Sequence, residues 1–149
     1  MDPKRKARVD LPNFPEDLFR TWLDERIEHM GWHPGSADWD ALFLDRPLKF
    51  WQSVAWHRLK FTISLPDLSA FSRGLILKQP PSTLGRFEPN DRARIQEQVA
   101  YISANGTFRD PPLLLLEGSK FLVLDGHHRL SGMFITNVIG PHEYWVACV

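Results

Sequence analysis

The stretch Val123-Leu124-Asp125-Gly126-His127-His128-Arg129-Leu130 passes from a short apolar run straight into ionisable residues. Its apolar part follows a second apolar run, Leu113–Leu116, across a Glu117-Gly118-Ser119 turn. Two such runs joined by a turn with glycine predict a hairpin whose strands are largely buried. Beyond Arg129, apolar residues at helical spacing predict a helix that carries Leu130, Met133 and Phe134 on one face.

Upstream of this hairpin, residues 91–104 are predicted to form a helix. Asn90 is expected to cap it, and Asn105-Gly106 to end it in a left-handed turn. Its buried stripe is predicted to consist of Ile95, Val99 and Ile102.

The segment from Arg58 to Leu65 alternates polar and apolar residues, which predicts a strand with Leu59, Phe61, Ile63 and Leu65 on its core face. Its polar face (Arg58, Lys60, Thr62, Ser64) is either solvated or borders a ligand cleft. Residues 69–89 are punctuated by glycine and proline, so a loop is expected, with a short strand at Leu75–Leu77. A final strand is predicted over Tyr144–Val149, and Cys148 on it is expected to be a small buried side chain.

The first part of the chain is predicted to be helical, over residues 13–30, 37–44 and 47–56. Asn13 and Ser36 are the expected caps of the first two helices, Pro47 suits the start of the third, and Gly31 ends the first. Five of the six tryptophans lie here, at positions 22, 32, 39, 51 and 56. We expect them to pack these helices onto the following sheet; the alternative is a surface that binds a protein partner.

The composition narrows the class of protein. The 149 residues carry 18 basic and 18 acidic side chains, and the zero net charge argues against coating nucleic acid by bulk positive charge. The single cysteine excludes an internal disulfide and a cysteine-based zinc site. No apolar run approaches the roughly 20 residues of a membrane helix, so a cytoplasmic protein without membrane contact is predicted. The basic start, with Lys4, Arg5, Lys6 and Arg8, is expected to be a frayed, solvated terminus; the alternative is contact with phosphates.

The loop at 125–129 is the main candidate for chemistry. A helix start presents unpaired N–H groups, and Gly126 allows a phosphate to approach the backbone. Arg129, His127 and His128 supply donors for phosphate oxygens, while Asp125 is placed to hold Mg²⁺ or to act as a base. These residue types together predict an anion site for nucleotide phosphates.

Plainer interpretations of the same residues stay open. Asp125 as a helix cap, Arg129 as its ion-pair partner and solvated histidines would explain the loop without a ligand. Zinc held by Asp125, His127 and His128 is a weaker hypothesis, because adjacent histidines point apart and no further ligands are evident. Ser131 is interpreted as a packed residue or a hydroxyl that bonds back to the helix backbone.

The pattern from Ile102 to Met133, including NG, RDPPLLLLEGSKFLVL and DGHHR, resembles the ParB/sulfiredoxin fold family. The resemblance runs from about residue 58 to the end. It implies an α+β domain over 58–149, with a small mixed sheet and packed helices, preceded by a Trp-rich helical extension over 1–57.

Within that family, sulfiredoxins place a cysteine where this chain has His127. Partition-type members carry Gly-Glu-Arg-Arg followed by an alanine, where this chain has its histidines and Gly132. The sequence of residues 125–129 is most similar to that of free-serine kinases, in which Asp-Gly-His-His-Arg contacts the nucleotide phosphates. That similarity implies phosphate binding by Gly126, His127, His128 and Arg129. It also implies catalytic roles near the reacting group for Asp125 and His128, and an upstream acid for which Asp67, Glu88 and Asp91 are candidates.

These observations lead to three functional hypotheses. The first is a nucleotide-binding domain that takes ATP or CTP with Mg²⁺ at Asp125 and performs phosphotransfer or nucleotide hydrolysis. The second is a DNA-associated module, a DNA-binding accessory or nuclease, that uses the basic start of the chain, Arg58, Lys60 and the arginines at 73, 86, 92 and 94. The third is a protein-interaction adaptor that binds its partner through the Trp-rich helices and keeps a degenerate nucleotide site.

Overall fold

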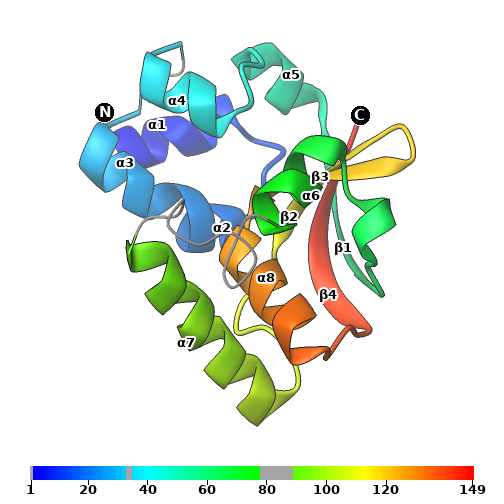
Figure 1. Ribbon diagram of the computed structural model, residues 1–149. Coiled ribbons are helices and arrows are strands. Elements are labelled where there is room, and N and C mark those ends of the chain that lie inside the picture. Colours follow the sequence, from blue (N-terminus) through cyan, green and yellow to red (C-terminus); the bar gives the residue numbers. More distant parts are fainter. Residues whose placement is uncertain (1, 33–34, 78–88) are drawn as a thin grey trace. The chain divides into compact units, whose positions relative to one another are not determined.

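The computed structural model describes residues 2–32, 35–77 and 89–149. It contains both helices and a four-stranded sheet, which confirms the α+β class (Figure 1). The chain divides into two compact units, one of residues 1–56 with Cys148 and Val149, and one of residues 57–147.

The first unit is helical. In chain order its elements are α1 (Pro3–Asp10), α2 (Glu16–Leu18), the π-helical turn η1 (Phe19–Leu23), α3 (Asp24–Met30), α4 (Ala37–Leu42) and α5 (Leu48–Ser53).

The helix predicted over 13–30 begins later than expected and is not continuous α-helix. Asn13 does not cap it, because its Nδ2 donates to the carbonyls of Trp51 and Val54, at 2.9 and 2.8 Å. A side chain bonded to a segment 38 residues away is invisible to a local capping pattern. The predicted end is confirmed: Gly31 has φ 72° and its N–H donates to the carbonyl of Ile27.

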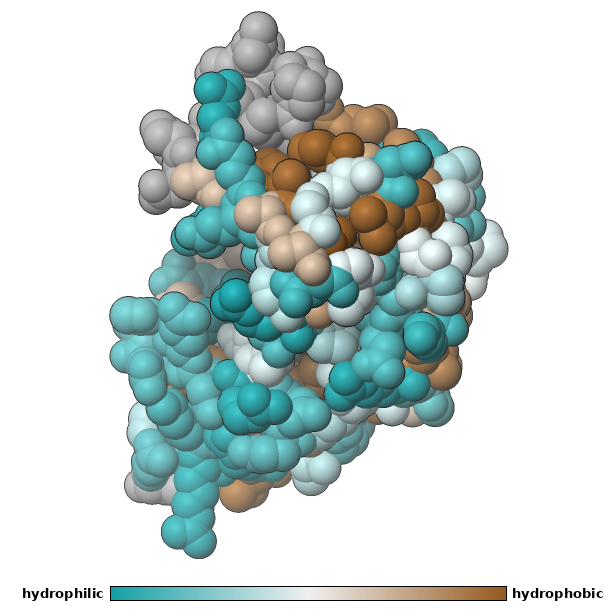
Figure 2. Space-filling model, turned by 90° about the horizontal axis from the view of Figure 1, so that it is seen from below, coloured by the Kyte–Doolittle hydropathy of each residue, from teal (hydrophilic) through white to brown (hydrophobic). Residues whose placement is uncertain are grey.

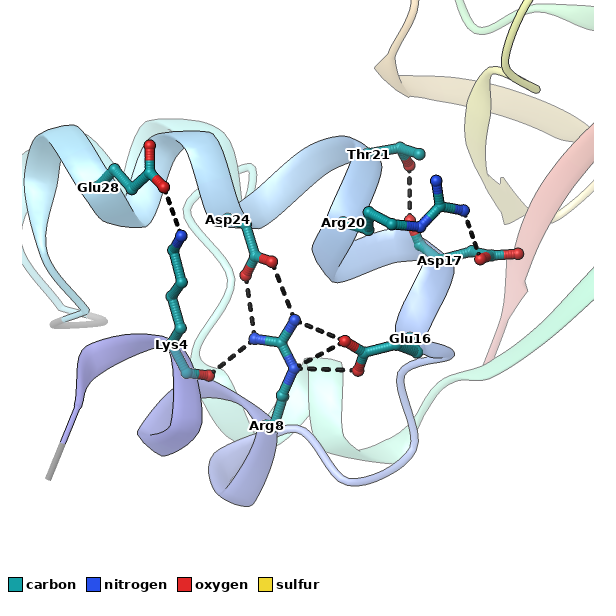
Figure 3. A network of polar contacts seen from close by, with 8 residues as sticks. All are labelled: Lys4, Arg8, Glu16, Asp17, Arg20, Thr21, Asp24 and Glu28. Atoms are coloured by element: carbon teal, nitrogen blue, oxygen red, sulfur yellow. Dashed lines mark hydrogen bonds and ion pairs between the residues drawn. The ribbon is translucent and has the colours of Figure 1, made fainter.

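The expectation of a frayed N-terminus was wrong, because α1 is an ordered helix. Asp2 accepts from the N–H of Lys4 at its start, and Ala7 is fully buried. Figure 3 shows why it is ordered: Arg8 donates to Glu16 and to Asp24, and so ties α1 to α2 and α3. Arg8, which was predicted to be solvated, is therefore the partner of two acids that follow later in the sequence.

The next two helices are shorter than predicted. α4 ends at Leu42 because Leu44 and Asp45 both have φ near 57°, and Ser36 makes no side-chain cap bond. α5 starts after Pro47, as expected, but ends at Ser53, and strand β1 begins at Ala55.

Aromatic rings form the core of this unit. Phe43 is their hub: its ring centroid lies between 5.4 and 6.2 Å from those of four tryptophans, Trp22, Trp32, Trp39 and Trp51. All four are buried, the most exposed being Trp32 at 7%. The rings therefore pack chiefly on one another, with several edge-to-face contacts of the kind that aromatic pairs favour.

The remaining elements, in chain order, are β1 (Ala55–Phe61), the short helix η2 (Leu65–Asp67), α6 (Ala70–Leu77), α7 (Pro89–Asn105), β2 (Leu113–Glu117), β3 (Lys120–Asp125), α8 (His127–Thr136) and β4 (His142–Cys148). The sheet order is β1-β4-β2-β3. β2 pairs antiparallel with β3 as the predicted hairpin, and parallel with β4.

Two predictions upstream of α7 were wrong. β1 ends at Phe61 rather than reaching Leu65, and Leu59 is 46% exposed although it alternates correctly. β1 is an edge strand, and an edge strand has less of its surface covered. Ala70–Leu77 is a helix, not a loop with a strand: Ser69 Oγ accepts from the N–H of Ser72 at its first turn. The rest of the predicted loop, 78–88, lies outside the described residues.

The elements after this point follow the predictions more closely. α7 begins at Pro89, so the predicted cap Asn90 lies inside the helix, and Gly106, with φ 77°, ends it as expected. Of the predicted stripe, Ile95 and Ile102 are buried and Val99 is half-buried. β4 begins at His142, two residues before the predicted start.

α7 and α8 pack closely because Gly132 lacks a side chain. A Cβ at Gly132 would lie 2.9 Å from the Cβ of Gln98 on α7. This unit has a buried apolar core, but Leu59 on β1, Phe71 and Leu77 on α6 and Ile135 on α8 are exposed. Figure 2 shows hydrophobic residues gathered on one side of a face that is otherwise largely hydrophilic.

Candidate functional site

The segment 125–129 joins the end of β3 to the start of α8. Asp125 is the last residue of the strand, Gly126 is the N-cap with φ 109°, and His127 is the first helical residue. A Cβ at Gly126 would lie 2.9 Å from the Cβ of Pro112 and 3.1 Å from Arg129 Nε. Glycine is therefore required both by the backbone conformation and by the tight packing of this turn.

Arg129 holds this turn together. Its Nη2 donates to Asp125 Oδ2 at 2.8 Å, and its Nη1 donates to the carbonyls of Asp110 and Pro111, at 2.7 and 3.2 Å. The Arg129 side chain is 15% exposed and that of Asp125 22%. The guanidinium thus fixes the loop before β2 against the end of β3, as in the plainer interpretation of the motif.

His127 brings a buried polar atom to the first turn of α8. Its Nε2 is buried and has no hydrogen-bond partner among the described residues. Burial lowers the pKa of His127 below the usual 6.5, although the charge of Asp125 opposes that shift. The imidazole is therefore predominantly neutral near pH 7 and keeps one donor and one acceptor nitrogen.

One helical turn later, Ser131 is 2% exposed and its Oγ also has no partner within the described part of the chain. The expected bond back to the helix backbone is absent there, so Ser131 is a packed residue. His128 lies beside His127 in the first turn and is half-buried.

The other predicted participants are dispersed. Asp67, a candidate upstream acid, accepts from the N–H and the hydroxyl of Ser64 at the start of η2, and these bonds lower its pKa. Glu88 and the Asp91 side chain lie outside the described residues. Arg58 is on β1, Arg73 on α6, and Arg92 and Arg94 on α7, while Arg86 is not described.

The described residues hold no group of three His, Cys, Asp or Glu side chains that could bind a metal ion. This finding removes support from the zinc hypothesis within 2–32, 35–77 and 89–149. Mg²⁺ binding at Asp125 stays a prediction, in which a bound ligand supplies the other oxygens around the ion.

Sequence reasoning missed the residues that complete this turn. The carbonyls of Asp110 and Pro111 receive Arg129, and Pro112 packs where a Gly126 side chain would lie. Backbone carbonyls leave no side-chain pattern. The Pro111-Pro112 pair was the one available signal, and it was interpreted only as the entry to a strand.

Comparison of the chain with protein-family models, with curated proteins and with solved structures finds no match. Among the described helices, none combines the length and the apolar character needed to cross a membrane.

Proposed function

We propose that the second unit is a ParB/sulfiredoxin-like domain that binds the phosphates of a nucleotide, ATP or CTP, at the start of α8. The order of its elements supports this proposal. The resemblance implies a strand, a helix, a hairpin and then a loop with its helix, and this unit has β1, then η2, α6 and α7, then the β2–β3 hairpin and the loop that leads into α8. The loop with the expected residues also stands at the start of a ten-residue helix.

The observation that carries the proposal is the buried, unpartnered Nε2 of His127 in that first turn. A buried polar atom without a partner costs free energy, and a ligand oxygen would satisfy it when Nε2 carries the proton. The N–H groups of the same turn and the positive end of the helix dipole favour an anionic ligand there.

The residues of the loop divide into two roles. Gly126 and Arg129 shape the turn, Arg129 through its bonds to Asp125 and to the preceding loop. His127 and His128 are the side chains proposed to contact phosphate oxygens. Mg²⁺ fits this site when the nucleotide brings it, because Asp125 offers a carboxylate and Mg²⁺ commonly binds one or two carboxylates together with substrate phosphates.

The proposed activity is phosphotransfer to an acceptor or hydrolysis of the nucleotide. This chain's residues would act by placing the phosphates and by supplying donors to their oxygens. His128 and Asp125 are the groups proposed to move a proton near the reacting phosphate. Asp125 would do so while its Oδ2 still accepts from Arg129.

A thermal-shift panel of nucleotides, with and without Mg²⁺, tests the proposal on the full chain. We expect ATP or CTP with Mg²⁺ to raise the melting temperature, because a ligand that binds only the folded state stabilises it. Calorimetry on Arg129→Ala should then show binding abolished, and on Arg129→Lys partly restored. His128→Gln should weaken binding while leaving the Asp125–Arg129 ion pair intact.

Arg94→Gln on α7 is the control, since it removes an exposed arginine outside the loop. A cooperative unfolding transition in each variant ensures that lost binding is not lost folding. Unchanged nucleotide affinity in Arg129→Ala and His128→Gln, or no shift with any nucleotide, would refute the proposal.

The structure lends less support to the other two hypotheses. The four buried tryptophans are packed inside the first unit, which favours their role in the core over a Trp-based partner surface. The arginines of the DNA hypothesis that are described lie on three different elements. Arg58 and Lys60, by contrast, lie together on β1, and both line a cleft that is described below.

A further inference from the structure

A cleft of about 370 Å³ lies within the second unit, between β1, the start of β4 and the loop that precedes β2. Three segments line this cleft. β1 contributes Arg58 and Lys60, the loop of residues 105–111 contributes Thr107, Phe108 and Arg109, and the start of β4 contributes His142 and Glu143. None of these residues belongs to the turn at 125–129.

The charge of the cleft is positive. Three cationic side chains, Arg58, Lys60 and Arg109, face one carboxylate, Glu143, among the described residues that line it. That carboxylate already accepts from Arg58, at 2.6 Å from Nη2 and 2.9 Å from Nε. The excess of two positive charges therefore resides chiefly with Lys60 and Arg109, both of which are exposed.

Aromatic rings hold the two arginines in place. The guanidinium carbon of Arg109 lies 4.7 Å from the centre of the Tyr101 ring, and that of Arg58 lies 5.8 Å from the centre of the Trp145 ring. Cations that are already positioned lose less conformational entropy when they bind a ligand. The cleft thus has the preorganisation that an anion site requires.

Three other residues that line the cleft, Thr107, Phe108 and His142, contact one another. His142 is 2% exposed; its Nε2 lies 2.6 Å from the carbonyl oxygen of Val138 and its Nδ1 2.8 Å from Thr107 Oγ1. A carbonyl oxygen only accepts, so Nε2 donates to Val138, and Nδ1 shares a hydrogen bond with the Thr107 hydroxyl. The centre of the Phe108 ring lies 4.8 Å from the centre of the His142 imidazole, and Phe108 adds an apolar surface to the lining of the cleft.

We propose that this cleft binds a small phosphomonoester dianion, with Arg109 and Lys60 as its main ionic contacts. The excess of two positive charges matches such a dianion, and an arginine fork pairs well with phosphate oxygens. A small ligand is favoured over nucleic acid because the whole chain has no net positive charge to attract a polyanion. The inference does not depend on nucleotide binding at α8.

Backbone amide NMR on the full chain provides the first test. The probes are inorganic phosphate and glycerol 3-phosphate, titrated against sodium chloride at matched ionic strength. We expect saturable shifts at Thr107, Arg109 and Glu143, and none at His127 or His128. Shifts confined to the start of α8, or shifts that chloride reproduces, would overturn the proposal.

Charge-removing variants provide the second test. Arg109→Gln and Lys60→Gln are each expected to weaken glycerol 3-phosphate binding about tenfold, as loss of one charge-assisted contact implies. Arg94→Gln on α7 and Lys49→Gln on α5 are the matched controls, each removing an exposed cation elsewhere. Equal affinity in Arg109→Gln and Arg94→Gln would overturn the proposal.

A third arm separates small ligands from nucleic acid. We expect a short single-stranded oligonucleotide to bind no more tightly than glycerol 3-phosphate, and with no greater dependence on Arg109. Tight, strongly salt-dependent oligonucleotide binding that Arg109→Gln removes would instead make the cleft a nucleic-acid site and refute a small-ligand function.

Discussion

The two units are stabilised by different kinds of contact. In the first, rings from separate helices converge on Phe43, and Arg8 joins three helices through carboxylates. In the second, aliphatic residues fill a strand-paired sheet, and one arginine closes a turn with a residue four positions away. Contacts between side chains of separate helices thus hold the first unit, whereas strand pairing and the bonds of Arg129 to Asp125 and to the loop before β2 organise the site of the second.

Removing the aromatic hub should have the largest effect. Phe43 is 2% exposed and touches four indole rings, so Phe43→Ala is expected to lower the free energy of unfolding by about 3–5 kcal/mol. Phe71→Ala on α6 removes the same side chain from a site that is 64% exposed and should cost well under 1 kcal/mol. Guanidinium denaturation followed by tryptophan fluorescence measures both. Similar losses in the two variants would contradict the hub.

The same difference explains what the sequence could predict. The hairpin and the end of α7 at Gly106 were predicted correctly, because each depends on residues within a few positions of one another. The helix expected beyond Arg129 is present as α8 but begins earlier, at His127. Phe43 was not singled out: it follows the end of α4, and its partners lie up to 21 positions away. Asn13 and Arg8 were misinterpreted for the same reason.

The candidate site was predictable in its residues but not in all of its contacts. The composition of 125–129 identified Asp125, Gly126 and Arg129, and the structure brings these three together. It could not show that Arg129 is bonded to two carbonyls, because backbone acceptors exist at every position. The cationic cleft was also only partly visible, since Arg109 and the polar face of β1 are about 50 residues apart in sequence.

A glycine-to-alanine pair probes the second unit at its tightest turn. Gly126→Ala meets both an unfavourable φ of 109° and a contact of 2.9 Å with Pro112, and we expect a loss of about 2–3 kcal/mol. Gly118→Ala in the hairpin has φ 62° but nothing within 4 Å of the new Cβ, so it should cost about 1 kcal/mol. The difference in unfolding free energy measures the close approach together with the greater backbone strain at φ 109° than at φ 62°. Equal losses would mean that the turn relaxes around the methyl group.

Arg8 tests whether ion pairs matter as much as rings in the first unit. Its guanidinium bonds Glu16 and Asp24, lowers the pKa of Glu16 and lies 4.6 Å from the centre of the Phe19 ring. We expect Arg8→Ala to cost about 1–2 kcal/mol, because a network of charged hydrogen bonds exceeds an isolated surface pair. Arg20→Ala, which removes an exposed pair with Asp17, should change stability by less than about 0.5 kcal/mol. A smaller loss in 1 M salt would identify the ionic part.

The smallest expected effect is the contribution of His127 to the pH dependence of the unfolding free energy. Because burial depresses its pKa in the folded chain, the unfolded chain binds the proton more readily, and stability falls as the pH drops below about 6.5. One such group contributes at most about 1.4 kcal/mol per pH unit. We expect His127→Gln to flatten the loss of unfolding free energy between pH 7.5 and 5.5, measured by urea denaturation without nucleotide or Mg²⁺. His29→Gln, which replaces an exposed histidine of the first unit, is the matched control. If both variants keep the slope of the natural sequence, His127 titrates alike in the folded and unfolded chain, and the argument from its buried nitrogen to a ligand loses its basis.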